Sequence, residues 1–127
     1  MADQAFSSPG RKLSLEAAAD LSSSQFLGAV VNSSGLAAVA GIGVPIIGVI
    51  QNKPAAAGRA TELMVSGTTK MFSGAAVTAG DDVAVDAAGK AVDAATGNHV
   101  LGLALTTVAN ADEILSVELG VGQRVHP

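Results

Sequence analysis

Hydrophobic and polar residues alternate over short stretches of this chain, with turn-forming residues between the stretches. In Lys12–Glu16, the alternation places Leu13 and Leu15 on one face of an extended segment. A period of two residues predicts half-buried β-strands. Similar patterns predict further strands at Phe26–Val31, Leu36–Ala40, Pro45–Gln51, Ala60–Ser66, Thr68–Phe72, Val83–Val85, Lys90–Asp93, Val100–Thr106 and Ile114–Leu119. About ten short strands predict an all-β fold, a small barrel or sandwich.

Alanine-rich patches at Glu16–Leu21, Ala55–Ala60 and Ala109–Glu113 add some helix propensity. None of them sustains an apolar period of 3.6 residues over a useful length. Isolated helices this short are not stable in water. The patches therefore predict single helical turns or small helices at most.

The chain also resembles itself at an offset of 54 residues, which aligns residues 25–66 with residues 79–120 without a gap. Eight aligned pairs are identical, and three of these are glycine pairs: Gly35 and Gly89, Gly43 and Gly97, and Gly48 and Gly102. Glycine is needed where a backbone turns or is closely approached, so aligned glycines indicate a repeated fold unit. The match predicts two copies of one β unit, arranged as two lobes or interleaved in one barrel.

The length of 127 residues fits a single β-rich domain, which we place at residues 13–127. Its core has few large side chains, because the chain contains three Phe, no Trp and no Tyr. A core of Ala, Val, Leu and Ile buries less apolar area per residue. Oligomerisation or docking on a partner is therefore expected to add stability.

Charge and cysteine content exclude several classes of function. The net charge is −4 and the seven Lys and Arg residues are scattered, so nucleic-acid binding is not expected. The absence of Cys excludes disulfides and thiolate metal sites, and fits a reducing cytoplasm. The N-terminus has no signal-peptide pattern. The most apolar stretch, Gly35–Ile50, is shorter than the roughly 20 residues of a membrane span and contains Pro45.

Three motifs are candidates for sites of chemistry. Gly41–Ile46 begins like a dinucleotide-binding loop, but Pro45 and the β-branched run after it predict a strand where that loop needs a helix. The acidic residues lack the ligand pattern of a calcium loop and are interpreted as turn residues: Asp81, Asp82, Asp86 and Asp93. The two imidazoles, His99 and His126, have neither metal-ligand spacing nor a nucleophile-elbow serine. The chain is predicted to be no enzyme and to have no catalytic, cofactor or metal site.

An ordered set of short motifs covers roughly residues 13–124. They are Ala17–Ser22, Ile47–Pro54, Ala75–Val83, Asp86–Ala91, Val100–Leu105 and Glu113–Leu119. In this order, the set resembles the small head-decoration, or capsid cement, proteins of tailed bacteriophages.

The resemblance implies a non-enzymatic virion protein that needs no cofactor. Such a protein binds the outer surface of an expanded phage head and stabilises it by bridging subunits of the major capsid protein. The implied assembly is a homotrimer on the shell, made in the host bacterial cytoplasm, without nucleic-acid or membrane partners. Two alternatives stay open: another structural β module of a phage or bacterial assembly, such as a tail or fibre, or a small-molecule-binding β-barrel.

The polar N-terminal residues 1–12 are interpreted as an extended arm, with a frayed terminus as the alternative. Such an arm can add a strand to an exposed sheet edge of a neighbour. Phe6 is its one large apolar anchor, and Arg11 and Lys12 can meet acidic residues of the shell. The hypothesis assigns capsid binding to Ala5, Phe6, Ser7, Ser8, Pro9, Arg11, Lys12 and Leu13.

Overall fold

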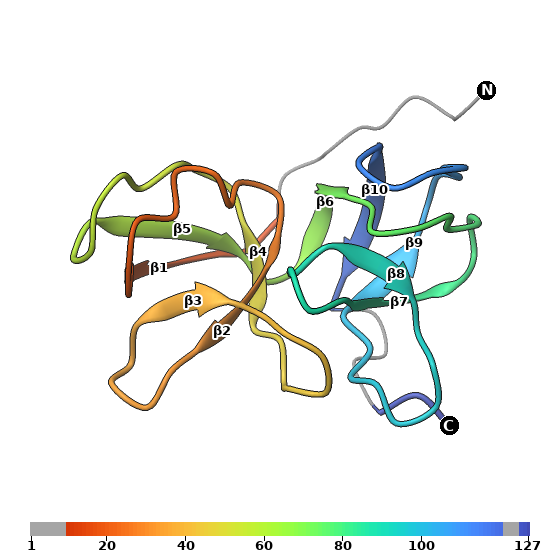
Figure 1. The fold of residues 1–127 in the computed structure, drawn as a ribbon, viewed down its shortest axis with the longest axis horizontal. Helices are drawn as coiled ribbons and strands as arrows, with labels where there is room; N and C mark the ends of the chain where they lie inside the picture. Colours follow the sequence, from red (N-terminus) through yellow and green to blue (C-terminus); the bar gives the residue numbers. More distant parts are fainter. Residues whose placement is uncertain (1–9, 121–124) are drawn as a thin grey trace.

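The computed structural model describes residues 10–120 and 125–127, and these residues contain ten β-strands and no helix (Figure 1). The strands are β1 (Lys12–Glu16), β2 (Gly28–Val31), β3 (Ala37–Val39), β4 (Gly48–Ile50), β5 (Ala60–Met64), β6 (Gly67–Phe72), β7 (Asp82–Val85), β8 (Ala91–Asp93), β9 (Gly102–Ala104) and β10 (Ile114–Leu119). The predicted all-β class is confirmed, and β1 and β10 have the predicted bounds.

The helical turns considered for the alanine-rich patches are not formed in the described chain. The last two patches contain Gly58 and Asp112, whose φ angles of 86° and 62° leave the right-handed helical region. Each of these residues instead donates its backbone N–H across the unit: Gly58 to the carbonyl of Ala17 at 2.9 Å, and Asp112 to that of Ser73 at 2.7 Å. The alanine runs therefore end in tight turns that lead into β5 and β10.

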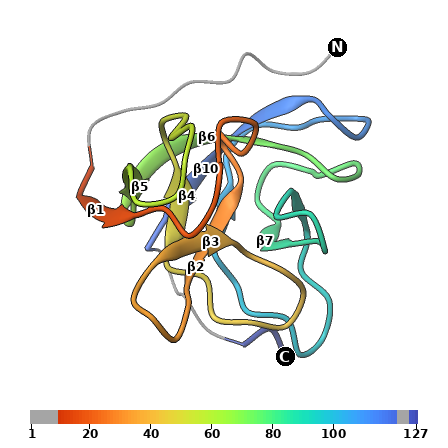
Figure 2. The same cartoon turned by 60° about the vertical axis from the view of Figure 1, so that its left-hand side comes forward.

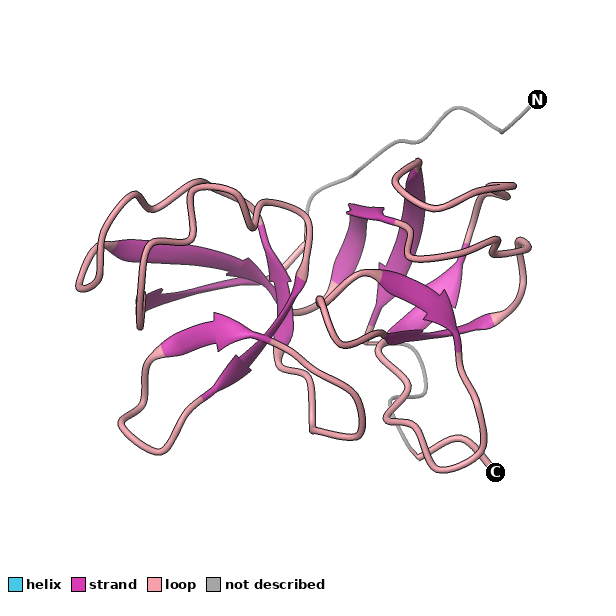
Figure 3. Cartoon of the chain, in the orientation of Figure 1, coloured by secondary structure: helices cyan, strands magenta, loops and turns pink. Residues whose placement is uncertain are grey.

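The strands form two antiparallel five-stranded sheets, which appear as two lobes in Figure 1 and as separate groups of arrows in Figure 3. We call β1–β5 the first unit and β6–β10 the second unit. Their strand orders are β1-β5-β4-β2-β3 and β6-β10-β9-β7-β8, so each strand has its counterpart five strands later. Each unit thus has a sheet of its own, and the identical order supports the predicted repeat.

The pairing register repeats as well. Ile50 faces Leu63 in the first unit, and Ala104 faces Val117 in the second, which preserves the offset of 54 residues. The first strands of the two units are not related by this offset. The bridge between Ala17 and Ala37 in the first unit corresponds to the bridge between Ser73 and Ala91 in the second. The connection after β1 is therefore two residues longer than the connection after β6.

The aligned residues Gly48 and Gly102 must be glycine for the same structural reason in both units. A Cβ atom on Gly48 would lie 2.4 Å from the carbonyl oxygen of Met64, and one on Gly102 would lie 2.1 Å from that of Glu118. A side chain at either position would push the neighbouring strand away. The sequence match therefore marked a place where two backbones approach closely.

The two units share one hydrophobic core. Its buried residues include Val49 and Met64 from the first unit, and Met71, Val85 and Leu115 from the second. The first unit has an additional small cluster of its own, which includes Ile50 and Leu63. The shared core consists of aliphatic residues and Met, and the smaller cluster of aliphatic residues alone, in agreement with the composition.

Backbone hydrogen bonds also join the units directly, and Figure 2 shows the strands of the two units from a second side. Gly28 N–H donates to the carbonyl of Gly89 at 2.8 Å, and Phe72 N–H donates to that of Phe26 at 3.2 Å. The rings of Phe26 and Phe72 pack with their centroids 6.3 Å apart. A Cβ on Gly28 would lie 2.8 Å from Val85 Cγ1, so the units meet closely only because glycine stands there.

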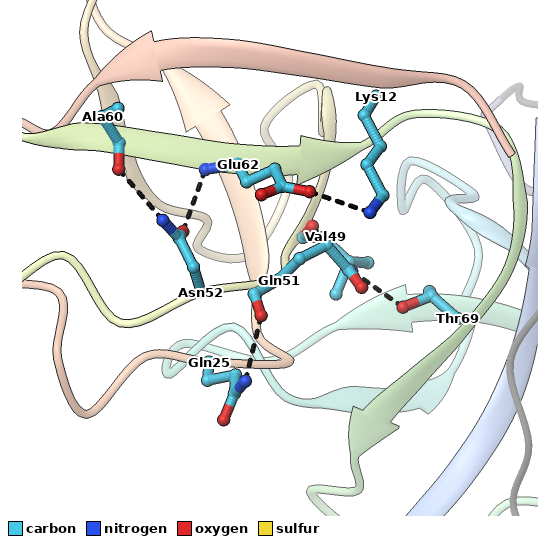
Figure 4. A network of polar contacts seen from close by, with 8 residues as sticks. All are labelled: Lys12, Gln25, Val49, Gln51, Asn52, Ala60, Glu62 and Thr69. Carbon is cyan, nitrogen blue, oxygen red and sulfur yellow. Dashed lines mark hydrogen bonds and ion pairs between the residues drawn. The ribbon is translucent and has the colours of Figure 1, made fainter. Parts of the chain in front are cut away.

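A polar network adds to this junction (Figure 4). The Gln51 side-chain amide donates to Thr69 Oγ1 at 2.8 Å, across the two units, and to the carbonyl of Val49 at 3.0 Å. The Gln25 amide donates in turn to the carbonyl of Gln51 at 2.9 Å. Partly buried polar groups are therefore satisfied where the units meet.

Substitution of Gly89 tests the importance of the junction. Gly89 and Gly35 have φ angles of 79° and 78°, but only a Cβ on Gly89 would meet the other unit, 2.7 Å from Val39 Cγ1. Gly35→Ala is expected to cost about 1–2 kcal/mol through backbone strain alone. Gly89→Ala is expected to cost about 1–3 kcal/mol more, because it overpacks the junction. Urea unfolding measures both, and equal costs would contradict the account.

Candidate functional site

Some of the residues predicted to bind the capsid lie outside the described residues, namely Ala5, Phe6, Ser7, Ser8 and Pro9. Arg11 lies beside the end of β5, where its carbonyl accepts from Val65 N–H at 2.9 Å. Lys12 and Leu13 belong to β1, so the strand begins within the segment that the sequence assigned to an arm.

Strand β1 forms an exposed edge of the first sheet. It pairs only with β5 among the described strands, and four of its five residues are exposed. Leu13 is 38% exposed, and Lys12 Nζ pairs with Glu62 Oε1 at 2.8 Å. An edge strand presents unpaired backbone groups that can accept a strand from another chain. Its counterpart β6 lies instead against the first unit, through the contact of Phe72 with Phe26.

A second exposed surface lies on the loop between β3 and β4. Ile42 is 63% exposed and Val44 is 37% exposed, and Val31, the last residue of β2, is 44% exposed. A shallow groove of about 210 Å³ runs alongside, lined by Val31, Pro45, Ile46 and Ile47. We call Val31, Ile42, Val44 and Pro45 the apolar tip. Exposed apolar residues gathered in this way indicate a contact surface.

Sequence reasoning did not identify the apolar tip as a surface. It predicted a strand rather than a helix after the glycines of Gly41–Ile46, and the structure confirms this: Gly43 has a φ of 76°, and strand β4 follows. The available signal was a difference between the units, because Thr96 and Asn98 stand in the second unit where Ile42 and Val44 stand in the first.

The corresponding loop of the second unit is covered by the C-terminal residues. Gly97 N–H donates to the carbonyl of His126 at 2.9 Å, and His126 N–H donates to that of Asn98 at 2.7 Å. His99 also forms an antiparallel bridge with Val125. Within the residues that the structure describes, no segment covers the apolar tip in this way.

Most of the acidic residues that the sequence grouped together meet at one depression of the second unit. It has a volume of about 270 Å³ and is lined by Asp81, Asp82, Asp93, Ala94 and His126. His126 Nδ1 lies 3.0 Å from Asp82 Oδ2. Burial, together with a hydrogen bond and repulsion from Asp81, raises the pKa of the Asp93 carboxyl. No group of ligands suited to a metal ion occurs among the described residues.

Asp86 has a separate, structural role. Its Oδ1 accepts from the backbone N–H groups of Ala88 and Lys90, at 2.9 and 3.0 Å, and thereby fixes the turn between β7 and β8. His99 Nε2 is buried and has no hydrogen-bond partner among residues 10–120 and 125–127. In residues 10–120 and 125–127, no helix is long and apolar enough to cross a membrane.

Known proteins that are similar to this chain match both of its β units. A family model described as phage cement protein matches residues 8–120. The fold is similar to that of the head fibre gp8.5 N base of bacteriophage phi29, with a TM-score of 0.63 and 13% sequence identity. The similarity covers 91% of this chain and 98% of that one, and at this identity it shows the fold alone. No curated protein matches the chain.

The raised pKa of Asp93 predicts a pH-dependent effect on stability. At pH values between the ordinary pKa of 3.8 and the raised pKa, the folded protein holds the proton of the Asp93 carboxyl more tightly than the unfolded chain does. Ionisation of Asp93 at neutral pH therefore opposes folding. Asp93→Asn is therefore expected to increase the free energy of unfolding at pH 7, and this gain should vanish as the pH falls towards 3.8.

Urea unfolding at several pH values and low protein concentration measures this effect. Asp20→Asn is the control of opposite sign, because hydrogen bonds from Ser22 lower the pKa of Asp20 and its charge favours folding. An Asp93→Asn gain that is the same at every pH would contradict the assignment.

Proposed function

This chain belongs to the phage cement protein family, and from that membership we propose that it binds the outer surface of an expanded phage head and stabilises it by bridging major capsid subunits. The family match carries the proposal, because it spans residues 8–120 and so includes both β units. The family is one of structural phage proteins. A non-enzymatic role therefore fits a surface whose most prominent features are an open strand edge and apolar side chains.

Bridging requires separate contact surfaces on one rigid body, and the first unit supplies two. Strands β1 and β3 are the outer strands of the first sheet, the bridge between Ala17 and Ala37 joins the end of β1 to the start of β3, and the apolar tip follows the other end of β3 (Figure 1). Contacts at both surfaces can reach two shell subunits at once. Simultaneous weak contacts give an avidity that neither contact provides alone.

The two surfaces suit different kinds of contact. The β1 edge offers backbone hydrogen bonds to an added strand, and the N-terminal residues that precede it extend the same contact. The apolar tip offers Ile42 and Val44, which gain about 25 cal/mol for each Å² of apolar surface that the shell covers. A shell that expands and exposes an apolar groove would thus be bound, whereas an immature shell without the groove would not.

In this proposal the chain acts on the outer surface of the virion, after synthesis in the cytoplasm of the host bacterium. Its partners are the major capsid protein and further copies of itself, assembled as a homotrimer on the shell. The limited aliphatic core supports self-association, since burial between copies adds stability that the monomer lacks.

A second candidate is the base of a head fibre. It is favoured by the similarity of fold to the gp8.5 N base, which this chain covers almost completely. As the base of a head fibre, this chain would hold a further domain or a partner that projects outwards from the head. Particles that hold only this compact chain at many equivalent positions would favour the cement role.

Co-sedimentation with purified shells tests the proposal. The full chain is expected to sediment with expanded shells and to remain in solution with immature ones. Ile42→Thr combined with Val44→Asn introduces the residues of the second unit and should lower the affinity at least about tenfold, with unchanged thermal stability. Ile114→Thr, at a residue that is 38% exposed outside the tip, is the matched control. Equal binding to both kinds of shell would exclude the proposed role.

The N-terminal contact is tested in the same assay with two deletions. Removal of residues 1–9 leaves β1 complete, whereas removal of residues 1–12 also takes its first residue. Shell occupancy is expected to fall with either deletion, because the contact available to an added strand is shortened. Unchanged occupancy after removal of residues 1–12 would refute the capsid-binding role of the arm.

A further inference from the structure

The second unit holds a segment of the first between the end of β6 and the turn that follows β7. Phe72 N–H, at the end of β6, donates to the carbonyl of Phe26 at 3.2 Å. Gly28 N–H donates to the carbonyl of Gly89, in the turn, at 2.8 Å. Residues 26–28 therefore lie like a short added strand, with one backbone hydrogen bond to each side.

Side chains of the second unit complete this contact. Val85 is 4% exposed, and a Cβ on Gly28 would lie 2.8 Å from its Cγ1. Thr69 is completely buried and accepts a hydrogen bond from the Gln51 amide at 2.8 Å. The residues of the second unit that meet the first in this way form what we call the covered face: Thr69, Phe72, Val85 and Gly89.

The first unit carries a copy of the covered face. The bridge of Ala17 corresponds to that of Ser73, which relates β1 to β6 at an offset of 56 residues, whereas β2 and the turn after it keep the offset of 54. The copy lies on β1, the end of β2 and the turn before β3, in the unit that Figure 2 brings forward. Its residues, in the same order, form what we call the exposed face: Leu13, Glu16, Val31 and Gly35.

Every residue of the exposed face is uncovered in the described chain. Leu13 is 38% exposed, and Val31 is 44% exposed, compared with 4% for its counterpart Val85. Glu16 and Gly35 are exposed as well, and nothing lies within 4 Å of a Cβ built on Gly35. A surface that binds a segment in one unit is thus open in the other.

The backbone of the exposed face has the donor and the acceptor that such a segment needs. Ala17 N–H donates to the carbonyl of Arg59, just before β5, at 2.8 Å. Because successive residues of a strand direct their backbone groups to opposite sides, Glu16 directs its N–H away from β5. No backbone N–H of the described residues donates to the Gly35 carbonyl. These two groups correspond to the donor and acceptor of the covered face.

The same segment of another copy does not supply the occupant, because residues 26–28 already hold the two units of each copy together. The charge of the exposed face indicates a different segment. Glu16 stands where Phe72 packs on Phe26, and its carboxylate has no ion-pair partner among residues 10–120 and 125–127. A Lys or Arg at the Phe26 position of an incoming segment would pair with this carboxylate.

The shape of the exposed face restricts the residue two positions later. Val31 is the counterpart of Val85, and the segment passes Val85 with Gly28 because a Cβ there would come too close. A glycine is therefore needed at this position of the incoming segment as well. Leu13 replaces the hydrogen-bonding Thr69, which favours an apolar rather than an amide side chain beside it.

We propose that the exposed face binds an extended segment of the major capsid protein in which Lys or Arg is followed, two residues later, by Gly. The inference rests on the proposed function, since it takes the shell as the source of the segment. Backbone hydrogen bonds to Glu16 N–H and the Gly35 carbonyl hold the segment. The Glu16 carboxylate and the Val31 side chain select its sequence.

Peptide titration of the full chain tests the exposed face without shells. The probe is a peptide with blocked ends, Ser-Ser-Gln-Arg-Leu-Gly-Ala-Val, which is residues 23–30 with Arg in place of Phe26. We expect saturable changes in the amide NMR signals of Glu16, Val31 and Gly35. The same peptide with Val in place of Gly should bind at least about tenfold more weakly, because its side chain meets Val31.

Charge reversal at Glu16 provides a second readout. Glu16→Lys should weaken binding of the Arg peptide about tenfold, and a peptide with Glu in place of Arg should restore it. Glu16→Lys should also lower the affinity for expanded shells about tenfold in co-sedimentation. Asp20→Lys makes the same change at an exposed carboxylate outside the face and should have no comparable effect in either assay.

The inference is overturned if the Gly and Val peptides bind equally well, or if Glu16→Lys leaves shell binding unchanged. It is also overturned if the amide signals of Val31 and Gly35 in the free chain change on dilution or on removal of residues 1–9, because a second copy or the chain itself then covers the face. Shell binding by the wild-type chain would leave the proposed function standing in each of these cases. Selective peptide binding without sedimentation on expanded shells would instead refute the proposed function.

Discussion

The close contact between Gly28 and Gly89 is the constraint on which the rest of the structure depends. Each unit alone has five short strands and few large apolar side chains, which is near the lower limit for a stable domain. The missing side chains at these glycines let the two sheets approach until one hydrophobic core extends across both. Two small units thereby become a single rigid body, as the proposed bridging of capsid subunits requires.

The two units share a backbone frame but differ at the edges, and these differences give the molecule its surfaces. The edge of β6 lies against the first unit, whereas the edge of β1 is exposed. The loop before β9 is held by the C-terminal residues, whereas the loop before β4 carries the exposed Ile42 and Val44. A repeated fold whose copies have diverged at their edges can contact several different neighbours without any reactive site.

Much of the fold could be predicted from the sequence, because alternation and turn residues act locally. The strands were located and the aligned glycines marked close approaches, as at Gly48 and Gly102. The role of β1 in the repeat was missed, since the two extra residues after it interrupt an ungapped alignment. The apolar tip was missed because exposure depends on which segment covers a loop, and that is decided by tertiary structure.

The most direct test of the central claim is electron cryomicroscopy of expanded phage heads assembled with and without this chain. The account predicts difference density on the outer surface, with two lobes, lying across boundaries between major capsid subunits. The lobe with the open β1 edge and the apolar tip should face the shell. Density confined to a tail, or to the centre of single capsid subunits, would contradict the account.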